Sequence, residues 1–368
     1  MTLVLSNDEI AELLTVPECL ARLEETYRDL GERKAANRPR SDVYLPADGA
    51  TERYVFKTMD GVVPRYEVAA LRLNSDVIRW QPGAAGVRKD KQPLAPGGKW
   101  VGLVLLFSTR TGEPLAIMPD GVIQRLRVGA TNAIAARYLA PEARTYALLG
   151  AGWQAGGQAL AMAAALPSLR ELRVYSPTRA NRERFAAEMT DRLGLEVRPV
   201  DDPRIAVRRA DLVGMATNSV SSVVDLEWVE PHAHLTCVKD SELGPGILER
   251  CALVVVHTRI WQPTNYLVGA GEEPVYGHDP LQALGGSLGD LQPARPASAI
   301  DLSTLPTLGE LVTGQVPTPP AGSMTCFVNV MGLGTQFAAL GFLAYERARE
   351  RGVGRELPTD WLLESVHP

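Results

Sequence analysis

A glycine-rich turn is the clearest sign of chemistry in the sequence. The segment GAGWQA, residues 150–155, follows the apolar run 146–149 and opens an alanine-rich stretch. Glycine at position 150 allows a tight turn, glycine at position 152 lets a pyrophosphate approach the backbone, and a small residue at position 155 permits close helix packing. The following helix N-terminus would offer unpaired N–H groups to phosphates. The segment predicts a dinucleotide site with these candidate cofactor-binding residues: Gly150, Gly152, Trp153, Gln154 and Ala155.

The residues after the next apolar run bear on which dinucleotide binds. An NAD site places an acidic residue about 20 residues beyond the glycine turn, where it accepts hydrogen bonds from the ribose. Here Ser176 takes that place, and Thr178, Arg179 and then Arg182 follow it. A hydroxyl and a guanidinium can bind a 2′-phosphate, which a carboxylate would repel. We therefore favour NADP(H) over NAD(H). In the alternative interpretation, Thr178 only caps the next helix and both arginines, Arg179 and Arg182, are solvated.

Three further residues are candidates for the nicotinamide end of the cofactor. Thr217 and Asn218 follow the fourth predicted strand, where a dinucleotide-binding sheet would direct them at the nicotinamide ribose, although the same residues could simply form a turn. Val238 ends the fifth predicted strand. Ligands bind outside the carboxyl ends of parallel strands, so we expect these residues to lie beside the glycine turn.

The elements that would position these residues follow from the hydrophobic pattern. After residue 124, an alanine-rich helix ends at Pro141, and apolar runs then alternate with helical segments. This alternation predicts an α/β fold with a doubly wound parallel sheet of the Rossmann type. A helix over residues 334–351 falls outside the alternation, and residues 263–320 are left unassigned. The predicted strands are 145–149, 172–175, 197–200, 211–216, 234–238 and 253–256.

The first 120 residues have a different pattern. Apolar residues at three- and four-residue steps predict two amphipathic helices over 7–34, split near Pro17. Short β-rich runs between residues 43 and 119 predict an antiparallel or mixed sheet, which includes a hairpin of 101–107 with 115–118. The Gly- and Pro-rich stretch 79–99 is expected to be irregular, as a surface insertion rather than a lid.

Length and composition limit the kind of protein. The length of 368 residues predicts two domains, and a net charge of -5 with scattered Lys and Arg gives no electrostatic footprint for nucleic acid. No apolar run is long enough for a membrane helix, and the N-terminus has no export signal, so we expect a cytoplasmic protein. Four cysteines and five histidines lack metal-ligand spacing, so neither a metal nor a disulfide is expected.

Four features together resemble the ornithine cyclodeaminase and mu-crystallin (ketimine reductase) family. They are Arg40 in RPRSDVYLP, Lys57 in YVFKTMDG, Arg127 in RVGATNAIAARYLA, and GAGWQA followed by ADLVGMATNS. The resemblance implies a Rossmann domain, residues 131–314, inserted into a substrate-binding and dimerisation domain made of residues 1–130 and 315–368. It therefore also implies a homodimer.

The resemblance further implies that Arg40, Lys57 and Arg127 bind the carboxylate of a small amino or imino acid, with the nicotinamide beside them. The chemistry is suitable, because a carboxylate needs cations and arginine binds it with two parallel hydrogen bonds. Lys57 could in addition donate a proton, since a desolvated lysine near two arginines would have its charged form disfavoured. We therefore predict catalytic roles for Lys57 and Arg127.

The sequence also departs from that family. Its cyclodeaminases use an aspartate in a segment resembling HxNAVGAD, whereas residues 234–241 here place Asp240 one position early and Ser241 in the aspartate's place. Asp240 is kept as a catalytic candidate, but the shift favours hydride transfer over ammonia elimination. RVGATN replaces the usual RTAAxS, and the acid often found near the C-terminal glycines is replaced around residues 332–337.

The predicted function is an NAD(P)H-dependent oxidoreductase that interconverts an amino acid or amine and its imino or keto form. One alternative is an ammonia lyase of the ornithine cyclodeaminase type that uses bound NAD. Another is a non-catalytic binding protein that depends on the cofactor.

Overall fold

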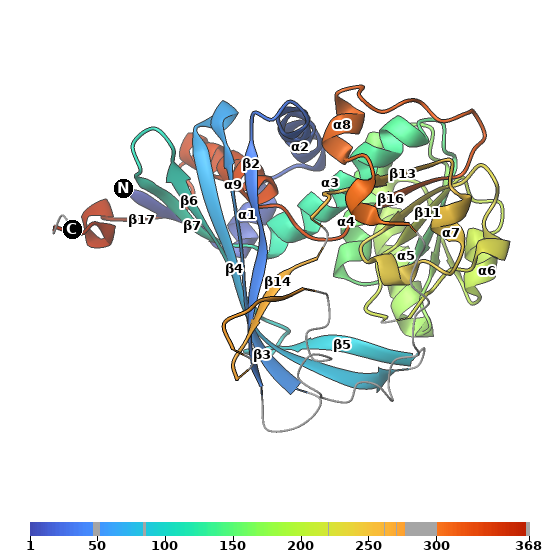
Figure 1. Cartoon of the computed structure of the whole chain (residues 1–368), viewed down its shortest axis with the longest axis horizontal. Helices are drawn as coiled ribbons and strands as arrows, with labels where there is room; N and C mark the ends of the chain where they lie inside the picture. The colour runs from blue at the N-terminus through green and yellow to red at the C-terminus, as the bar shows by residue number, and fades with distance from the viewer. Residues whose placement is uncertain are drawn as a thin grey trace.

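The computed structural model describes residues 1–46, 52–83, 86–219, 221–260, 262–269, 271–276 and 300–365. These residues form two β-sheets that stand side by side, with helices in the space between them (Figure 1). Of the segment 263–320, left unassigned above, residues 277–299 lie outside the described ranges.

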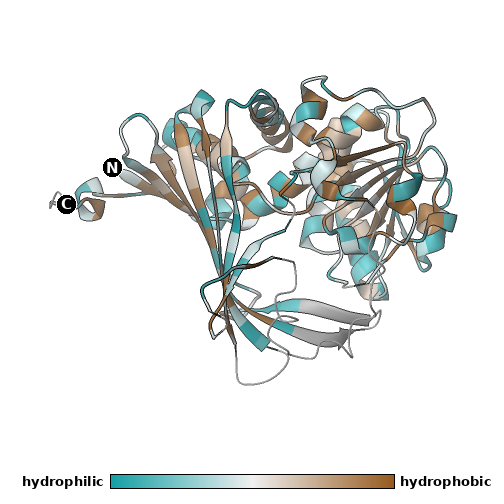
Figure 2. Ribbon diagram, viewed as in Figure 1, coloured by the Kyte–Doolittle hydropathy of each residue, from teal (hydrophilic) through white to brown (hydrophobic). Residues whose placement is uncertain are grey.

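Seven parallel strands form the sheet on the right of Figure 1. Their order is β10-β9-β8-β11-β12-β16-β13, and the chain reverses direction across the sheet between β8 and β11, where a doubly wound sheet leaves a ligand crevice. Figure 2 shows these strands in hydrophobic colours, as strands covered on both faces require. The predicted fold class is confirmed. The bounds are β8 (Thr145–Leu149), β9 (Glu171–Tyr175), β10 (Glu196–Val200), β11 (Leu212–Met215), β12 (His234–Cys237), β13 (Leu253–Val256) and β16 (Thr325–Val328).

All six predicted strands of this sheet are present within one residue of their predicted bounds. The helices that accompany them are α4 (Trp153–Ala165), α5 (Arg179–Leu193), α6 (Pro203–Val207), α7 (Ile247–Arg250) and α8 (Leu308–Val312). Strand β16 was not predicted. It inserts between β12 and β13, although residues 315–368 were expected in the other domain. Helix α3 (Gly121–Leu139) also crosses the expected boundary at residue 130.

The second sheet has ten strands and is mixed, as predicted. Its central strands β2, β3, β4, β6 and β7 are antiparallel, and the predicted hairpin is confirmed as β6–β7. Strands β14 and β15 extend the edge beside β2, so part of the segment 131–314 belongs to this sheet. The bounds are β1 (Thr2–Val4), β2 (Ala36–Pro46), β3 (Glu52–Val63), β4 (Val68–Gly83), β5 (Gly86–Gln92), β6 (Val101–Ser108), β7 (Pro114–Pro119), β14 (Thr264–Leu267), β15 (Val275–Tyr276) and β17 (Arg355–Leu357).

The prediction of an irregular stretch over residues 79–99 is wrong. Strand β4 continues to Gly83 and pairs with β5, from Val77 opposite Gln92 to Gly83 opposite Gly86. The glycines thus flank the tip of a long hairpin, where a tight reversal favours them, and pairing along β4 satisfies the backbone N–H and C=O groups of β5. This β4–β5 hairpin extends from the mixed sheet toward the parallel sheet (Figure 1).

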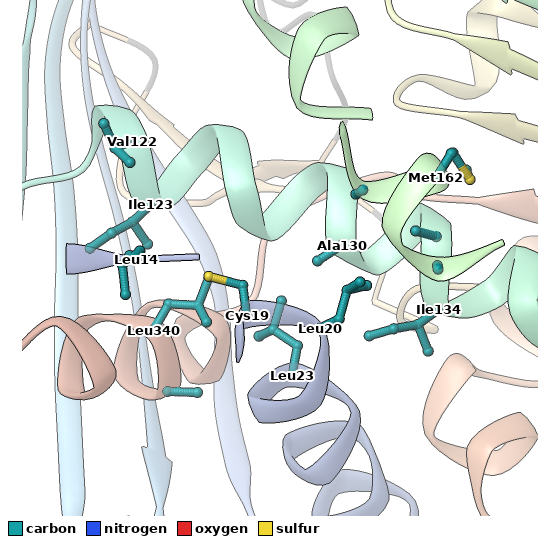
Figure 3. Packing of buried hydrophobic residues seen from close by; sticks show 14 of the residues in the cluster. Leu14, Cys19, Leu20, Leu23, Val122, Ile123, Ala130, Ile134, Met162 and Leu340 are labelled. Carbon is teal, nitrogen blue, oxygen red and sulfur yellow. The ribbon is translucent and has the colours of Figure 1, made fainter. Parts of the chain in front are cut away.

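One apolar core joins the two halves. The two predicted N-terminal helices are α1 (Asn7–Leu13) and α2 (Val16–Gly31), each begun by a side-chain cap, from Ser6 and Thr15. They pack with α3, α4 and α9 (Gly334–Arg351) through these buried residues, which Figure 3 labels: Leu14, Cys19, Leu20, Leu23, Val122, Ile123, Ala130, Ile134, Met162 and Leu340. Helix α9 matches its predicted bounds.

Glycines allow two close approaches that set the position of α3 and α9. A Cβ at Gly129 on α3 would lie 2.3 Å from the carbonyl oxygen of Gly157 on α4. A Cβ at Gly334, where α9 begins, would lie 1.9 Å from the backbone of Asp60 on β3. Because both approaches exclude any larger residue, the middle of α3 is held against α4 and the start of α9 against β3.

Candidate active site

The glycine turn joins β8 to α4 at the carboxyl edge of the parallel sheet. Gly150 has a φ of 120°, and a Cβ there would lie 2.3 Å from the carbonyl oxygen of Ala216 after β11. Its N–H donates to Tyr175 at 2.9 Å. Both the backbone conformation and the close approach require glycine, so this position has the constraint that the sequence suggested.

The start of α4 offers free donors to open space. Gly152 is the N-cap residue and makes no side-chain cap, and no atom lies within 4 Å of where its Cβ would be. Ala155 is fully buried, which allows the helix to pack closely. The Oε1 of Gln154 is buried without a hydrogen-bond partner among the described residues. These observations fit a pyrophosphate at this helix terminus.

Trp153 points toward α3. The guanidinium carbon of Arg125 lies 4.1 Å from the centre of the indole ring, and the indole Nε1 donates to the carbonyl of Gly121 at 3.5 Å. The ring is nevertheless 55% exposed, so it forms part of the surface between the two sheets.

The two arginines that follow Ser176 at the end of β9 have different surroundings. Ser176 is nearly buried, and its carbonyl accepts a hydrogen bond from Arg182 Nη1 at 3.0 Å. Thr178 is the N-cap residue of α5 but makes no side-chain cap. Arg179 points to solvent and pairs with Glu183 at 2.7 Å. The guanidinium nearest Ser176 is thus that of Arg182, one helical turn beyond the selected arginine.

A buried carboxylate joins the loops that follow β11 and β12. Oε1 of Glu242 accepts hydrogen bonds from the backbone N–H and hydroxyl of Thr217, at 2.7 and 2.8 Å. Oε2 accepts from the N–H groups of Val238 and Lys239, at 3.0 and 3.1 Å. Burial raises the pKa of Glu242, against the opposing effects of Lys239 and these donors. The Glu242 carboxylate therefore brings Thr217 and Val238 together, and their cofactor-binding roles stay predictions.

Sequence analysis missed Glu242, because an acid in a short polar run carries no local signal. The residue that was selected, Asp240, begins the same single turn (Asp240–Glu242) and is only half-buried. Its catalytic role stays a prediction. The side-chain amide of Asn218 donates to Asp90 on β5 at 3.0 Å and so links the loop after β11 to the β4–β5 hairpin. Its expected role at the nicotinamide ribose stays a prediction.

The mixed sheet carries a polar surface beside the start of α3. Strand register pairs Asp42 with Lys57 and Lys57 with Asn74 across β2, β3 and β4, and paired side chains share a face. Arg72 and Asp76 lie two residues before and two residues after Asn74 on β4, so their side chains are on the same face. Farther along the strands the same face is apolar and packs on α9. The polar surface is thus the uncovered end of a face that otherwise forms core.

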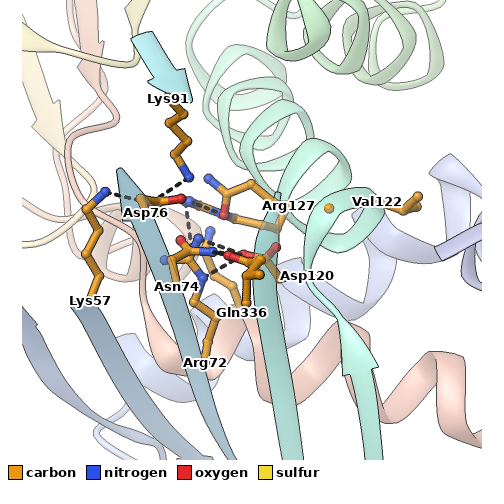
Figure 4. Close-up of polar contacts among 12 residues, drawn as sticks. Lys57, Arg72, Asn74, Asp76, Lys91, Asp120, Val122, Arg127 and Gln336 are labelled. Atoms are coloured by element: carbon orange, nitrogen blue, oxygen red, sulfur yellow. Dashed lines mark hydrogen bonds and ion pairs between the residues drawn. The ribbon is translucent and has the colours of Figure 1, made fainter. Parts of the chain in front are cut away.

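Lys57 and Lys91 share one carboxylate. Each ammonium nitrogen lies 2.9 Å from Oδ2 of Asp76, whose side chain is fully buried (Figure 4). Burial by itself raises the pKa of Asp76, but the two ammonium groups lower it, and the net shift is downward. The sequence-based expectation for Lys57 considered only two nearby arginines, and the structure adds a carboxylate at 2.9 Å; the protonation behaviour of Lys57 stays a prediction.

Asp120 fixes the start of α3 to β4. It accepts from Arg72 Nε at 2.8 Å and from Asn74 Nδ2 at 3.2 Å. A Cβ at Gly102 would come within 2.1 Å of the Asp120 carboxylate and 2.3 Å of the Asn74 amide, so this arrangement requires glycine there.

Arg127 is buried and is oriented by neutral groups. Its guanidinium donates to Gln124 Oε1 at 2.9 Å and to Gln336 Oε1 at 3.3 Å, and among the described residues it forms no ion pair with a carboxylate. Burial, together with the positive charge of Arg72, lowers the pKa of Arg127 to about 9. A buried guanidinium that lacks an anion among the described residues is suited to bind the carboxylate of a ligand.

Arg40 completes the predicted set of basic residues. Its Nη2 donates to Asp42 Oδ2 at 2.9 Å, and its Nε is buried without a hydrogen-bond partner in the described ranges. It is near enough to Arg127 to lower the pKa of that group. The structure thus brings Arg40, Lys57 and Arg127 close together at the polar surface of the mixed sheet, although their roles stay predictions.

A buried network supports Arg127 from behind. The Gln336 amide nitrogen donates to Tyr27 and to Thr131, each at 2.8 Å, and His257 Nε2 lies 2.7 Å from the Tyr27 hydroxyl. Burial, together with the charge of Arg127, lowers the pKa of His257 to about 3. The imidazole is therefore neutral in the folded protein at neutral pH.

Two absences concern only the residues that the structure describes. Within them, His, Cys, Asp and Glu form no group of three or more that could hold a metal ion. No helix in those ranges is long and apolar enough to cross a bilayer.

The glycine turn of a parallel sheet, in a chain that also carries a second, mixed sheet with basic side chains, defines a dinucleotide-binding protein of the Rossmann type. The model of the ornithine cyclodeaminase/mu-crystallin family matches residues 90–352, and the chain belongs to that family. The predicted family is confirmed.

Individual relatives are reductases and dehydrogenases of amino and imino acids. The chain is 26% identical to a Delta(1)-pyrroline-2-carboxylate reductase of Bacillus cereus, over 70% of this chain and 74% of the relative. The structure resembles the Thermococcus litoralis Delta(1)-pyrroline-2-carboxylate reductase in complex with NADH and L-proline, with a TM-score of 0.73, 24% identity, and coverage of 97% and 100%. It also resembles an archaeal alanine dehydrogenase dimer with bound NAD, with a TM-score of 0.73, 24% identity, and coverage of 97% and 99%.

The buried histidine generates a prediction about stability and pH. Burial lowers the pKa of His257 to about 3 in the folded protein, whereas the imidazole has its ordinary pKa of 6.5 in the unfolded chain. Between pH 6.5 and pH 3, therefore, the unfolded chain takes up a proton that the folded protein does not. Stability that is fully present above pH 6.5 is therefore lost as the pH falls toward 3. Urea unfolding should show that the free energy of unfolding falls more steeply in the wild type than in His257→Asn, by about 1.4 kcal/mol per pH unit. Equal slopes between pH 6 and pH 4 would contradict this assignment.

Proposed function

We propose that this protein is an NAD(P)-dependent oxidoreductase that interconverts an amino acid, or a cyclic or secondary amine, with its imino or keto form. The observation that carries the proposal is Arg127, a buried guanidinium without a carboxylate partner in the described chain, on the helix that packs beside the glycine turn. When bound, the nicotinamide supplies a hydride to the imine carbon or accepts one from the amine.

In this proposal the basic residues orient the substrate. Arg127 and Arg40 bind its carboxylate, and Lys57 lies next to them on β3. Reduction of an imine also requires a proton at nitrogen. The Lys57 ammonium is the donor, because Asp76 keeps it protonated until the substrate nitrogen takes the proton.

A cyclodeaminase would use the same cofactor site but needs an additional acidic group at the substrate amine. The buried acid at that edge of the sheet, Glu242, has both oxygens engaged by backbone and hydroxyl donors. Ser241 occupies the position of the family's aspartate. We therefore place net hydride transfer ahead of ammonia elimination.

We further propose that NADP(H) is the preferred cofactor. Support comes from the end of β9, where Ser176 replaces the usual acid and the Arg182 guanidinium lies against its carbonyl. A 2′-phosphate at this point would meet a hydroxyl and a cation. The cytoplasm is proposed as its location, because Cys19, Cys237, Cys251 and Cys326 are free thiols.

A homodimer is proposed from the outer face of the mixed sheet. On the side opposite the polar surface, apolar side chains are exposed on β2, on β3, on β14 and at the residue that follows β14. They are Val43, Leu45, Tyr54, Tyr266 and Val268. Register places Val43 beside Tyr266 and Leu45 beside Tyr54, so the side chains form a continuous strip. A strip of this kind marks an association surface.

The first test is turnover. Purified protein should consume NADPH when offered a panel of cyclic imino acids, or keto acids with amines. Arg127→Gln should lower kcat/KM by about 30-fold or more, because the substrate carboxylate loses its buried partner. Arg38→Gln is the control, since Arg38 lies on the same strand as Arg40 but is exposed and pairs with Asp60. Ammonia release from a diamino acid without net cofactor consumption would support a cyclodeaminase and overturn the proposal.

The second test concerns the 2′-phosphate. Ser176→Asp should raise the KM for NADPH about tenfold or more and favour NADH, because a carboxylate repels the phosphate and accepts from the ribose. Arg182→Gln should also raise the KM for NADPH, and Arg179→Gln should do so less, because Arg179 pairs with Glu183 in solvent. An enzyme that prefers NADH from the outset, with no response to Ser176→Asp, would refute the cofactor assignment.

The third test is the oligomeric state. The wild type should have twice the chain mass of 39.8 kDa in light scattering, and Val43→Glu combined with Tyr54→Glu should give the mass of one chain. Charges placed within an apolar contact are costly because they lose water without gaining a partner. Trp361→Glu is the matched control, as Trp361 is an exposed apolar residue that follows β17, the strand at the opposite edge of the sheet from β15. A wild type that is monomeric, or a dimer that tolerates the double substitution, would exclude this surface.

A further inference from the structure

The side-chain amide of Gln336 has a fixed orientation beside Arg127. Its Oε1 accepts from the Arg127 guanidinium at 3.3 Å and from the backbone N–H of Leu333 at 3.0 Å. Its Nε2 donates to Tyr27 and to Thr131, each at 2.8 Å. An amide has two N–H donors on its nitrogen and two lone pairs on its oxygen, so this buried side chain uses its full hydrogen-bonding capacity.

Backbone groups decide which end of the amide faces the guanidinium. The hydroxyl of Thr131 donates its proton to the carbonyl oxygen of Arg127 at 2.7 Å, because a carbonyl can only accept. Thr131 must therefore accept from Gln336, which places the amide nitrogen there and the oxygen on the other side. The N–H of Leu333 needs an acceptor and supports the same orientation. The hydrogen bonds thus form a closed loop from the Arg127 carbonyl, through Thr131 and Gln336, back to the Arg127 guanidinium.

This loop is incompatible with a carboxylate at position 336. A glutamate has nearly the shape of a glutamine, but it would direct an acceptor oxygen at the Thr131 oxygen, whose proton is already donated elsewhere. The amide that the loop requires is neutral, so it orients Arg127 without bringing a negative charge to it. Gln124, which also accepts from the guanidinium, is neutral as well.

We infer that Gln336 is a positioning residue, oriented by Thr131, whose neutral oxygen keeps the charge of Arg127 available to the carboxylate of the substrate. The alignment of the guanidinium and its selectivity for an anion then depend on the same hydrogen-bonded loop. This inference rests on the proposed function, because it concerns the residue that binds the substrate there.

The surroundings of Arg127 make the neutrality of its partners important. Burial and the charges of Arg72 and Arg40 lower the pKa of Arg127, so the site already disfavours the cation. A carboxylate that reaches this guanidinium is bound by hydrogen bonds between two charged groups, which are stronger than those between neutral groups. A carboxylate at position 336 would hold the same donors permanently and would compete with the substrate.

The competing interpretation is that Gln336 serves only the packing of α9 on α3. A packing role would change the stability of the protein and the affinity for all ligands of the site alike. A positioning role would change the affinity for a carboxylic acid much more than the affinity for its neutral amide. The ratio of these two affinities therefore separates the interpretations.

The experiment is a calorimetric titration of the holoenzyme with matched pairs of ligands. The enzyme is saturated with NADP⁺, or with NAD⁺ if that cofactor binds more tightly. It is then titrated with L-proline and L-prolinamide, and with L-alanine and L-alaninamide. The members of each pair differ only in a carboxylate against a carboxamide. In at least one pair, the affinity of the wild type for the acid should be higher by about tenfold or more.

Substitutions at the two amides test the effect of charge. Gln336→Glu and Gln124→Glu should each lower the ratio of affinities, acid over amide, by about tenfold, because an internal carboxylate neutralises Arg127. Gln124→Glu leaves the loop intact, so it tests the inference even if Gln336→Glu does not fold. Gln158→Glu is the matched control, because Gln158 is equally buried but bonds to Tyr146 of the parallel sheet. It should leave the ratio unchanged.

Substitutions of Thr131 test the effect of orientation. Thr131→Val removes the acceptor for Gln336 at nearly constant volume and should lower the ratio by about threefold or more, and Thr131→Ser should restore it. In turnover, the same valine variant should raise KM for the acid and change kcat less. A wild type that binds acid and amide equally, or a ratio that both glutamate variants leave unchanged, would overturn the inference. A ratio unchanged in Thr131→Val would refute the role of Thr131.

The binding measurement separates this inference from the proposed function, because it needs no turnover. A ratio that falls in the glutamate variants supports the role of Gln336 even if no imine is reduced and the proposed function fails. Turnover of imino acids, together with a ratio that these variants do not change, would support the proposed function and refute the role of Gln336.

Discussion

The structure depends on keeping a buried guanidinium in one place. Burying the charge of Arg127 is costly unless its donors are satisfied, and here amide oxygens of Gln124 and Gln336 satisfy them. Gln336 is held in turn by Tyr27 and Thr131, so three helices must be docked before the guanidinium is oriented. The close glycine contacts of α3 and α9 are the means of that docking. The orientation of this guanidinium and the packing of the two halves are therefore one structural problem.

Local pattern was sufficient to predict the cofactor half of the molecule. Each strand of the parallel sheet is a short apolar run because it is covered on both faces, and such runs stand out from the helices between them. Gly150 could be interpreted from sequence for a similar reason, since its constraints arise from the turn itself and from the adjacent strand. Features fixed by neighbouring residues, or by continuous burial, are visible in a single sequence.

Features fixed by distant partners were not visible. Strand β16 is an apolar run like the others, but only its insertion between β12 and β13 shows that it belongs to the parallel sheet. Glu242 is important because donors from two loops meet its carboxylate. The role of Lys57 depends on Asp76, which lies beside it on another strand. The β4–β5 hairpin was missed because its glycines and proline suggest a loop, whereas pairing with a long existing strand makes it regular. In each case the partner of a polar group decided its role.

The hydrogen bond between Asn218 and Asp90 has a consequence for how the two ligands influence each other. It attaches the strand that carries Lys91 to the loop at the nicotinamide end of the parallel sheet. A ligand that orders this loop therefore also orders the strand, and the entropy of that ordering is lost only once for both. Thermodynamic linkage makes such an effect reciprocal, so the dinucleotide and the acid each raise the affinity for the other by the same factor. Ordered addition of the two ligands would then be a property of a single side-chain contact rather than of a large domain closure.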